Sequence, residues 1–301
     1  MQPSRSDLAD FTYFLAIARH RSFRLAGVEV GVSASGLSHA LKGLEARLGV
    51  RLLNRTSRSV TLTAAGEELR RMIEEPFAAI ADAMESLNQL RNSPMGRIRL
   101  NVPEDAATLL LGPVLPVFMD RYPEVKIDVA VSNRMVDVID GGFDAGIRFG
   151  GTVPEDMVAQ RLSADVEYVV VGSPAYLARF GAPEHPNDLA GHRCVGVRLG
   201  NDQIYRWEFD QGEERIAVPV DSPVTQDGTQ FARKLALEGA GLAYLPLPPV
   251  AGDIKKGALT SVLESWLSPG PGFHVYYSSR RQLPEGLRLL IDTIRELRPL
   301  G

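Results

Sequence analysis

The chain has 301 residues, and at roughly 100–200 residues per domain this length predicts two or three domains. Hydrophobic residues make up 45% of it and charged residues 23%, which are ordinary globular values that allow a sizeable core. The net charge of −4 by itself argues against a nucleic-acid partner. However, residues 1–64 hold nine basic and four acidic residues (+5), and the remainder holds 24 and 33 (−9), so only the N-terminal part is expected to meet a polyanion.

Three short helices are predicted in the first 50 residues. The first covers residues 8–19, where apolar residues recur at the i, i+3, i+4 and i+7 spacing of one buried stripe. Ser22 is a good N-cap for the second helix, and Gly31 supplies its end. Ser33 can cap the third helix, which Gly49 ends.

The third predicted helix has two contrasting faces. Its apolar face is formed by four leucines at positions 0, 4, 7 and 11, namely Leu37, Leu41, Leu44 and Leu48. Its opposite face carries short or cationic side chains, namely Ser35, Ser38, His39 and Lys42. A helix-turn-helix places the N-terminal residues of its second helix against base edges in the major groove. The preceding helix, the tight turn and the local positive charge favour this interpretation over a merely solvated face.

Residues 51–62 predict a small wing of two short strands, near residues 52–54 and 60–62. Arginines at a hairpin tip suit phosphate contact or insertion into a narrow minor groove. We therefore assign base reading to Ser35, Ser38, His39 and Lys42, phosphate or minor-groove contact to Ser22, Arg24, Arg55 and Arg58, and include Ser33 at the helix start in the DNA-binding set.

A long helix is predicted from a cap at Thr63 to about residue 92, and thirty residues at ~1.5 Å each make a rod of ~45 Å. Its apolar residues step by 4, 3, 4 and 3, a seam typical of pairing with a second copy, namely Ile73, Phe77, Ile80, Met84 and Leu87. Pro76 inside the helix is expected to kink it or to loosen one hydrogen bond.

Residues 91–96 form the clearest linker, after which strands and helices alternate, and such alternation implies parallel sheets covered on both faces. Strands are predicted at residues 97–102, 125–131, 145–149, 167–172, 241–245 and 275–278, with a hairpin at 205–209 and 215–218. Helices are predicted at residues 106–121, 135–141, 174–180, 229–238 and 285–297.

Enzyme, metal and membrane functions are all disfavoured. No nucleophile-elbow, zinc-protease, P-loop or dinucleotide motif is present, and the five histidines and one cysteine have no metal-ligand spacing. A nucleophile built from His192 and Cys194 is an alternative, although a buried structural thiol is favoured. With one cysteine, no apolar signal region and no apolar run of ~18 residues, we expect a cytoplasmic protein.

Several motifs resemble the LysR-type transcriptional regulators, over essentially the whole chain. In the N-terminal part these are Ser22-Phe23, Ser38, Leu44-Glu45, Leu48-Gly49-Val50, Leu53, Arg55-Thr56, Arg58, Leu62-Thr63 and Ala65-Gly66. Downstream they are GFDAGIR at 142–148, SPAYL at 173–177, His192-Arg193-Cys194, LAYLP at 242–246 and YYSSRR at 276–281. Gly27 and Gly36 depart from the family pattern, in which alanine, and proline or alanine, are common.

The resemblance implies an α/β multidomain protein. Its parts would be a winged helix-turn-helix at residues 1–62, a dimerising linker helix at 63–92 and an effector-binding domain at 93–301. The effector-binding domain would have two α/β lobes resembling type 2 periplasmic binding proteins, lobe I at 96–167 and 272–301 and lobe II at 168–271. The resemblance also implies tetramers built from dimers, with RNA polymerase as a further partner.

Within this arrangement a small-molecule effector would lie between the lobes. Pro103, Glu104 and Asp105 precede a helix whose N-terminal N–H groups could hold a carboxylate, but the two acids fit a ligand with donor groups better, unless they merely cap their own helix. Arg148, Arg198 and Asp227 lie where strand ends should approach the cleft and could pair with a ligand or each other, while Gly196 and Pro246 would shape its walls.

The resulting prediction is a DNA-binding transcriptional regulator, not an enzyme, whose DNA binding or promoter output responds to that effector, with no other cofactor and no metal. Two alternatives stay open. One is a small-molecule-binding protein or enzyme whose basic N-terminal part serves another purpose, and the other is a DNA-binding protein that takes no ligand.

Overall fold

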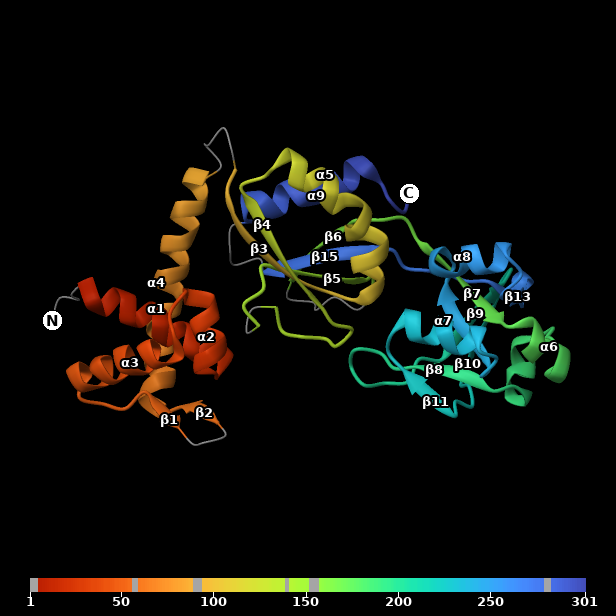
Figure 1. Ribbon diagram of the computed structural model, residues 1–301, viewed down its shortest axis with the longest axis horizontal. Coiled ribbons are helices and arrows are strands. Elements are labelled where there is room, and N and C mark those ends of the chain that lie inside the picture. Colours follow the sequence, from red (N-terminus) through yellow and green to blue (C-terminus); the bar gives the residue numbers. More distant parts are fainter. Residues whose placement is uncertain (1–4, 56–58, 89–93, 139–140, 152–156, 279–282) are drawn as a thin grey trace. The chain divides into compact units, whose positions relative to one another are not determined.

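The computed structural model describes residues 5–55, 59–88, 94–138, 141–151, 157–278 and 283–301 (Figure 1). The chain divides into two compact units. The first consists of Met1–Asn92, Ile139–Gly142 and Arg280–Glu285, and the second of Ser93–Val138, Phe143–Ser279 and Gly286–Gly301. Arg58, one of the predicted DNA contacts, lies outside the described residues, as do residues 91–93 of the predicted linker.

Three helices open the first unit at the predicted places, namely α1 (Arg5–His20), α2 (Phe23–Val30) and α3 (Ala34–Leu48). The hydroxyl groups of Ser22 and Ser33 each accept a hydrogen bond from the backbone N–H three residues on, so both serines are N-caps. Gly31 and Gly49 end α2 and α3 at φ values of 70° and 72°, a left-handed conformation that glycine adopts without steric penalty. We refer to these helices with the wing that follows as the head.

The head has its own hydrophobic core. Fully buried side chains from all three helices meet there, namely Phe14, Ile17, Ala26, Leu37, Leu41 and Leu44. Each buried leucine, isoleucine or phenylalanine side chain stabilises the fold by roughly 1.5–3 kcal/mol relative to exposure. Leu48, the last residue of α3, is 37% exposed, so the predicted apolar face of this helix is one leucine too long.

The wing consists of β1 (Leu53–Arg55) and β2 (Val60–Leu62), paired antiparallel with Leu53 opposite Leu62. Glu45 of α3 anchors its start, because one carboxylate oxygen accepts the N–H groups of Leu52 and Leu53 at 2.8 and 3.2 Å. The wing is thereby fixed to the side of the helix that was predicted to read DNA.

Helix α4 (Ala64–Asn88) follows the wing, and the Thr63 hydroxyl caps it by accepting the N–H of Gly66 at 3.0 Å. The helix is continuous through Pro76. Its first half packs against the head core through partly buried residues that include Ile73, whereas three later residues of the predicted seam are largely exposed, namely Ile80 (56%), Met84 (69%) and Leu87 (67%).

The first sheet of the second unit belongs to lobe I. Its strands are β3 (Gly96–Val102), β4 (Val125–Val131), β5 (Ala145–Phe149), β6 (Met157–Arg161) and β15 (Phe273–Ser278), and their order is β4-β3-β5-β15-β6. The helical elements of this lobe are η1 (Ala106–Leu111), a π-helix, then α5 (Gly112–Arg121) and α9 (Glu285–Leu297). Figure 1 shows α5 and α9 beside this sheet. Ile98 of β3, Phe118 of α5 and Leu290 of α9 are buried.

The second sheet belongs to lobe II. Its strands are β7 (Val166–Gly172), β8 (Cys194–Val197), β11 (Val224–Gln226), β12 (Leu242–Pro246), β13 (Thr260–Val262) and β14 (Pro269–Gly270), in the order β11-β8-β12-β7-β13 with β14 also on β7. A separate hairpin joins β9 (Trp207–Gln211) to β10 (Glu214–Val218). The helical elements are α6 (Pro174–Phe180), η2 (Pro186–Gly191), α7 (Thr229–Leu237), α8 (Leu247–Lys255) and η3 (Glu264–Trp266).

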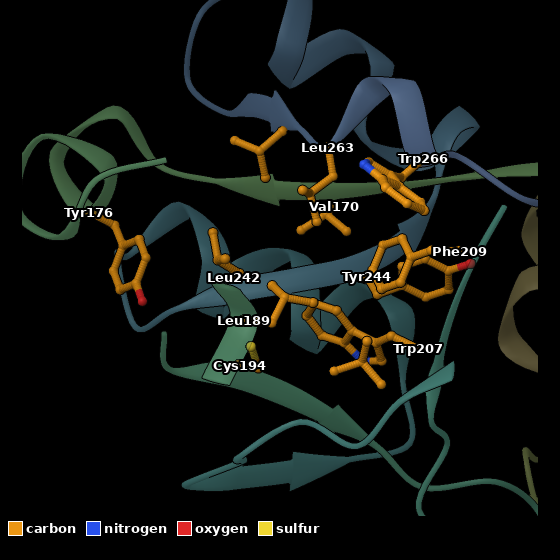
Figure 2. Close-up of a cluster of buried hydrophobic side chains, with 12 residues drawn as sticks. Val170, Tyr176, Leu189, Cys194, Trp207, Phe209, Leu242, Tyr244, Leu263 and Trp266 are labelled. Carbon is orange, nitrogen blue, oxygen red and sulfur yellow. The ribbon is translucent and has the colours of Figure 1, made fainter. Parts of the chain in front are cut away.

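The core of lobe II is rich in aromatic rings (Figure 2). Trp207 stacks on Tyr244 with ring centroids 5.5 Å apart. Cys194 lies in the same cluster with 1% exposure, and burial raises the pKa of its thiol to about 12, so the sulfur is protonated at neutral pH. The ring of His192 bonds the Tyr176 hydroxyl at 3.2 Å instead of the sulfur, which favours the structural interpretation of this thiol.

Two predictions of secondary structure were wrong. Both sheets are mixed instead of parallel, because β7 and β15 run antiparallel to their neighbours. The helix predicted at 135–141 is absent from residues 135–138, whereas the segment 106–121 is helical as predicted and starts as a π-helix. Several short elements were not predicted, namely β6, β8, β11, β13, β14, η2, η3 and α8.

Two chain crossings connect the lobes, one before β7 and one before β15. Side chains of the first crossing hold the backbone of the second, since Ser163 Oγ accepts the N–H of Phe273 at 2.9 Å and Asp165 Oδ1 accepts that of Gly272 at 3.2 Å. A Cβ on Gly272 would come within 2.5 Å of the carbonyl oxygens of Ser163 and Ala164, so only glycine fits. The crossings therefore act as one narrow connection.

Candidate nucleic-acid interface and lobe contact

The face of α3 opposite the head core divides into two kinds of residue. His39 and Lys42 are exposed, as a base-reading role requires. Ser35 and Ser38 are engaged within the head, because Ser35 Oγ lies 3.1 Å from Ser33 Oγ and Ser38 Oγ accepts from Arg55 Nη1 at 2.9 Å. The structure thus brings a wing arginine onto the helix face that carries His39 and Lys42.

The remaining predicted contacts of the head lie around the starts of α2 and α3. The hydroxyls of Ser22 and Ser33 are occupied by helix capping, although both residues stay at the surface. Arg24 is exposed on the first turn of α2. The Arg55 guanidinium lies over the Phe23 ring, 4.3 Å from its centroid, and Phe23 is a residue that the sequence interpretation did not assign.

Acidic side chains of the head pair with some of its basic side chains and not with others. Glu29 pairs with Arg19 at 2.7 Å and with His20 at 2.5 Å. Arg47 pairs with Asp7 at 2.9 Å and also with Asp10. Within the described part of the chain, no salt bridge to a carboxylate involves Arg24, Lys42 or Arg55. The unneutralised charge of the head therefore includes the predicted DNA contacts.

In the second unit, two acids of lobe I contact the first turn of helix α7 in lobe II. Asp105 Oδ2 accepts from the Thr229 hydroxyl at 2.8 Å, and Glu104 Oε2 accepts from the backbone N–H of Gln230 at 3.4 Å. Asp105 makes no capping hydrogen bond to its own helix, which contradicts the alternative that it merely caps. A carboxylate at a helix N-terminus is electrostatically favourable, so Glu104 holds the place that an anionic ligand would take on α7.

Asp105 is the most perturbed carboxyl of this contact. Burial raises the pKa of its carboxyl to about 6, the Thr229 hydrogen bond lowers it, and the charge of Glu104 raises it. Its second oxygen, Oδ1, is buried and has no hydrogen-bond partner among the described residues. This acid is therefore an unsatisfied acceptor beside the lobe contact.

Arg148 is 5% exposed, and its guanidinium is held by oxygens of lobe I. Nη1 donates to the carbonyls of Asn101 (3.2 Å) and Ile147 (2.7 Å). Nη2 donates to the Asn101 side-chain oxygen and to the carbonyls of Arg134 (2.8 Å) and Ser132 (3.4 Å). The guanidinium therefore ties the ends of β3 and β5 to the loop after β4.

Two other predicted effector contacts, Asp227 and Arg198, lie on lobe II. The carbonyl of Asp227 accepts a hydrogen bond from Asn133 Nδ2 of lobe I. Gly200 O of lobe II accepts the N–H of Met135 at 3.1 Å, so these two bonds are further links between the lobes. Arg198 is exposed on lobe II and donates to the carbonyl of Asp202 at 3.4 Å.

Pro103, Gly196 and Pro246 are buried structural residues. A Cβ on Gly196 would meet the side chain of Ser222 at 2.7 Å, so this glycine permits close packing of β8. Pro246 ends β12 opposite Tyr168. In the second unit the residues that the sequence interpretation missed are Asn101, Asn133 and Thr229, and an asparagine between Leu100 and Val102 of β3 was the signal for the first of them.

We expect the substitution Asp105→Asn to stabilise the protein at pH 7.5. The folded-state pKa of about 6 exceeds the ordinary 3.8, so ionisation of Asp105 costs stability progressively as pH rises from about 4 to 6, by up to about 3 kcal/mol above that range. The amide keeps an oxygen for Thr229 and carries no charge. Thermal unfolding of the full chain should show a gain at pH 7.5 that falls to about a third of its size near pH 4.5.

Asp227→Asn is the matched control, because the Asp227 side chain is exposed. It should leave the melting temperature unchanged at both pH values. A gain for Asp105→Asn that is equal at pH 4.5 and 7.5 would show that the charge of Asp105 is not its source.

No group of three or more histidine, cysteine or acidic side chains suited to hold a metal ion occurs in the described ranges. Within the same ranges, no helix combines the length and the apolar character needed to span a bilayer.

A winged helix-turn-helix head followed by a long helix and a two-lobed α/β domain defines the class of DNA-binding regulators with a periplasmic-type binding domain. Residues 8–67 match the family described as "Bacterial regulatory helix-turn-helix protein, lysR family", and residues 91–299 match the "LysR substrate binding domain". The chain therefore belongs to the LysR family of transcriptional regulators.

Individual relatives are similar to this chain over nearly its whole length. It is 36% identical to the "Uncharacterized HTH-type transcriptional regulator YcaN" of Escherichia coli (strain K12), over 97% of this chain and 95% of that protein. Among solved structures, CrgA of Neisseria meningitidis, a LysR-type transcriptional regulator, matches with a TM-score of 0.60 and 27% identity over 99% of both chains. The virulence activator AphB of Vibrio cholerae has the same fold, with a TM-score of 0.68 and 23% identity over 97% of this chain and 99% of that one.

Proposed function

We propose that this chain is a cytoplasmic, non-enzymatic regulator that binds double-stranded DNA through its head and responds to a small molecule held between its two lobes. The observation that carries the DNA-binding part is the exposed pair His39 and Lys42 on α3, joined there by the Arg55 guanidinium. Lysine and arginine can donate to guanine O6 and N7, and histidine can meet several bases. The LysR-type relatives support the same assignment.

Lys42 gives the sharpest test of DNA binding. The full chain would select a duplex from a random-sequence pool, and binding would be measured at several salt concentrations. We expect Lys42→Ala to weaken binding to the selected duplex by about 1–3 kcal/mol, that is about 5- to 150-fold, and to relax preference at one position.

Lys126→Ala, at an exposed lysine of lobe I, is the control and should change neither affinity nor salt dependence. Weak, sequence-independent binding that is the same for the wild type and both variants would favour the rival class, a ligand-binding protein or enzyme whose basic head has another purpose.

The effector would lie at the contact between Glu104, Asp105 and helix α7. In this arrangement the lobes are joined by the protein's own hydrogen bonds, so an effector acts by replacing some of them. A ligand with donor groups can pair with the free Oδ1 of Asp105, whereas an anionic group would compete with Glu104 at the start of α7. Arg148 would hold this wall of lobe I in place, while Arg198 and Asp227 flank the contact and Pro103, Gly196 and Pro246 keep its backbone close-packed.

The proposed mechanism is a shift of population between lobe arrangements. An effector changes that equilibrium only through its different affinity for the two states, and the altered packing between effector domains would change the spacing of the heads on DNA. Thermal shift of the full chain against amines, amides and carboxylates tests for the effector, since a ligand of the folded state raises the melting temperature. A panel with no response would favour DNA binding without a ligand.

We also propose that the chain associates with further copies of itself. The exposed apolar residues of the second half of α4 suit a dimer through the linker helix, with tetramers formed from dimers, and RNA polymerase is a further partner at promoters.

A further inference from the structure

The Arg55 side chain contacts two side chains of the head, each from a different helix. The guanidinium starts from the end of β1 and donates through Nη1 to Ser38 Oγ of α3 at 2.9 Å. Its Cζ lies 4.3 Å from the centroid of the Phe23 ring, at the first position of α2. The same guanidinium is thus fixed from one side by a hydrogen bond and from another by an aromatic face.

Each neighbour is itself fixed by the head. Ser22 caps α2 immediately before Phe23, and the Phe23 ring packs against the head core. Ser38 lies next to the buried Leu37 on the second turn of α3. Because both neighbours are held by local structure, the position of the guanidinium is set before any ligand arrives, which lowers the entropic cost of using a long, flexible side chain.

The guanidinium keeps most of its donors. Arginine has five N–H groups, of which the Ser38 contact uses one, and no carboxylate among the described residues of the head pairs with Arg55. Burial is not the reason for the contact, since Arg55 is exposed. An exposed, oriented and unneutralised guanidinium suits bidentate contact with a phosphate or with guanine O6 and N7.

We propose that Phe23 and Ser38 are positioning residues that orient Arg55 for DNA, and that Ser38 acts through Arg55 instead of reading a base. This inference rests on the proposed DNA binding. It changes the role assigned to Ser38 from the sequence, and it moves Arg55 from the wing tip to the face of α3 that carries His39 and Lys42.

A double-mutant cycle separates the two roles of Ser38. The full chain and its variants would be titrated with the duplex that the wild type selects from a random-sequence pool. We expect Ser38→Ala to weaken binding about 2- to 10-fold and Arg55→Ala about 5- to 150-fold. The double variant should bind no more weakly than Arg55→Ala alone. A second, equal loss from Ser38→Ala in the Arg55→Ala background would show direct reading by Ser38 and overturn the proposal.

The aromatic neighbour is tested in the same way. Phe23→Leu keeps an apolar side chain in the core and should weaken binding about 2- to 5-fold, with no further loss in the Arg55→Ala background. Arg55→Lys should restore little of the affinity, because an ammonium lacks the planar fork that stacks and donates at once. Full recovery by lysine would show that only charge matters.

A measurement without DNA distinguishes failure of this inference from failure of the proposed function. In the free, ¹⁵N-arginine-labelled protein, rotation of the Arg55 guanidinium should be hindered, and Ser38→Ala should release it. Arg24, which is exposed, is the internal reference. Averaged signals for Arg55 like those of Arg24 would overturn the positioning role even if the chain binds DNA, whereas hindered rotation in a chain that selects no duplex would leave the geometry intact and refute DNA binding instead.

Discussion

The double substitution Ile80→Glu/Met84→Glu is expected to convert the protein to monomers. The two side chains are 56% and 69% exposed and lie one turn apart on α4. In a paired helix each contributes roughly 1.5–3 kcal/mol by burial, and a dimer contains two copies of each. Loss of four apolar groups, with four carboxylates brought together, should weaken association at least about a thousandfold, since each 1.4 kcal/mol is a factor of ten. Sedimentation velocity over a concentration series measures this.

Ala79→Glu provides the control on the same helix. At 100° per residue it lies roughly 120° from the midline of the seam, and it is exposed. It should leave the sedimentation coefficient unchanged. Unchanged dimers in the double variant would place the interface elsewhere and leave the exposed residues of α4 without a proposed partner.

The same substitutions also test how DNA affinity depends on assembly. Ile73, the first residue of the predicted seam, packs against the head core, so the free part of the seam begins after it. Substitutions at Ile80 and Met84 therefore leave the head intact, and a monomeric variant should keep weak contact with a half-site. The expected loss of affinity for a full operator then reports the link between two heads and not damage to one of them.

Elements set by local chemistry were the ones that could be predicted from the sequence. Ser22, Ser33 and Thr63 were assigned as helix caps, and each accepts a backbone N–H three residues on. Gly31 and Gly49 were assigned as helix ends, and both have the left-handed backbone that such ends require. Capping involves residues within one turn of each other, so the residue types alone carry the signal.

Contacts between distant residues could not be predicted in this way. Ser38 and Arg55 are 17 residues apart, and their pairing depends on how Glu45 fixes the wing to α3. Strand direction failed for the same reason, because β15 joins the lobe I sheet after the chain has passed through lobe II. A pattern of alternating strands and helices does not indicate that the chain returns from lobe II to the lobe I sheet, or in which direction its last strand then runs.

Arg148 shows the same limit within the effector domain. It is the last residue but one of β5, and an arginine near a strand end was predicted to pair with a ligand or with one of the other predicted contacts, Arg198 and Asp227. The structure turns it inward, where Asn101 supplies both its backbone and side-chain oxygens. Strand position alone does not tell which side a long side chain takes when a buried asparagine lies on the neighbouring strand.

The substitution Arg148→Met is therefore expected to destabilise lobe I strongly. Methionine fills similar volume but leaves five acceptor oxygens without this donor, three of them in buried and two in partly buried hydrogen bonds. Loss of hydrogen bonds to a buried charge should cost about 3–5 kcal/mol, which lowers the melting temperature of a domain of this size by about 10 °C. Arg148→Lys, with three donors on a point charge, should fall between the wild type and Arg148→Met.

Scanning calorimetry of the full chain would measure these effects, and Arg134→Met is the matched control. Arg134 lies on the loop after β4 that Arg148 contacts, and its side chain is exposed. Only its backbone oxygen, which the substitution keeps, accepts a hydrogen bond from Arg148. Its variant should melt within about 1 °C of the wild type, because surface substitutions change stability by less than ~0.5 kcal/mol. If Arg148→Met melted like Arg134→Met while effector response was lost, Arg148 would be a ligand contact, one of the two roles that the sequence left open, and not the tie that holds β3, β5 and the loop after β4 together.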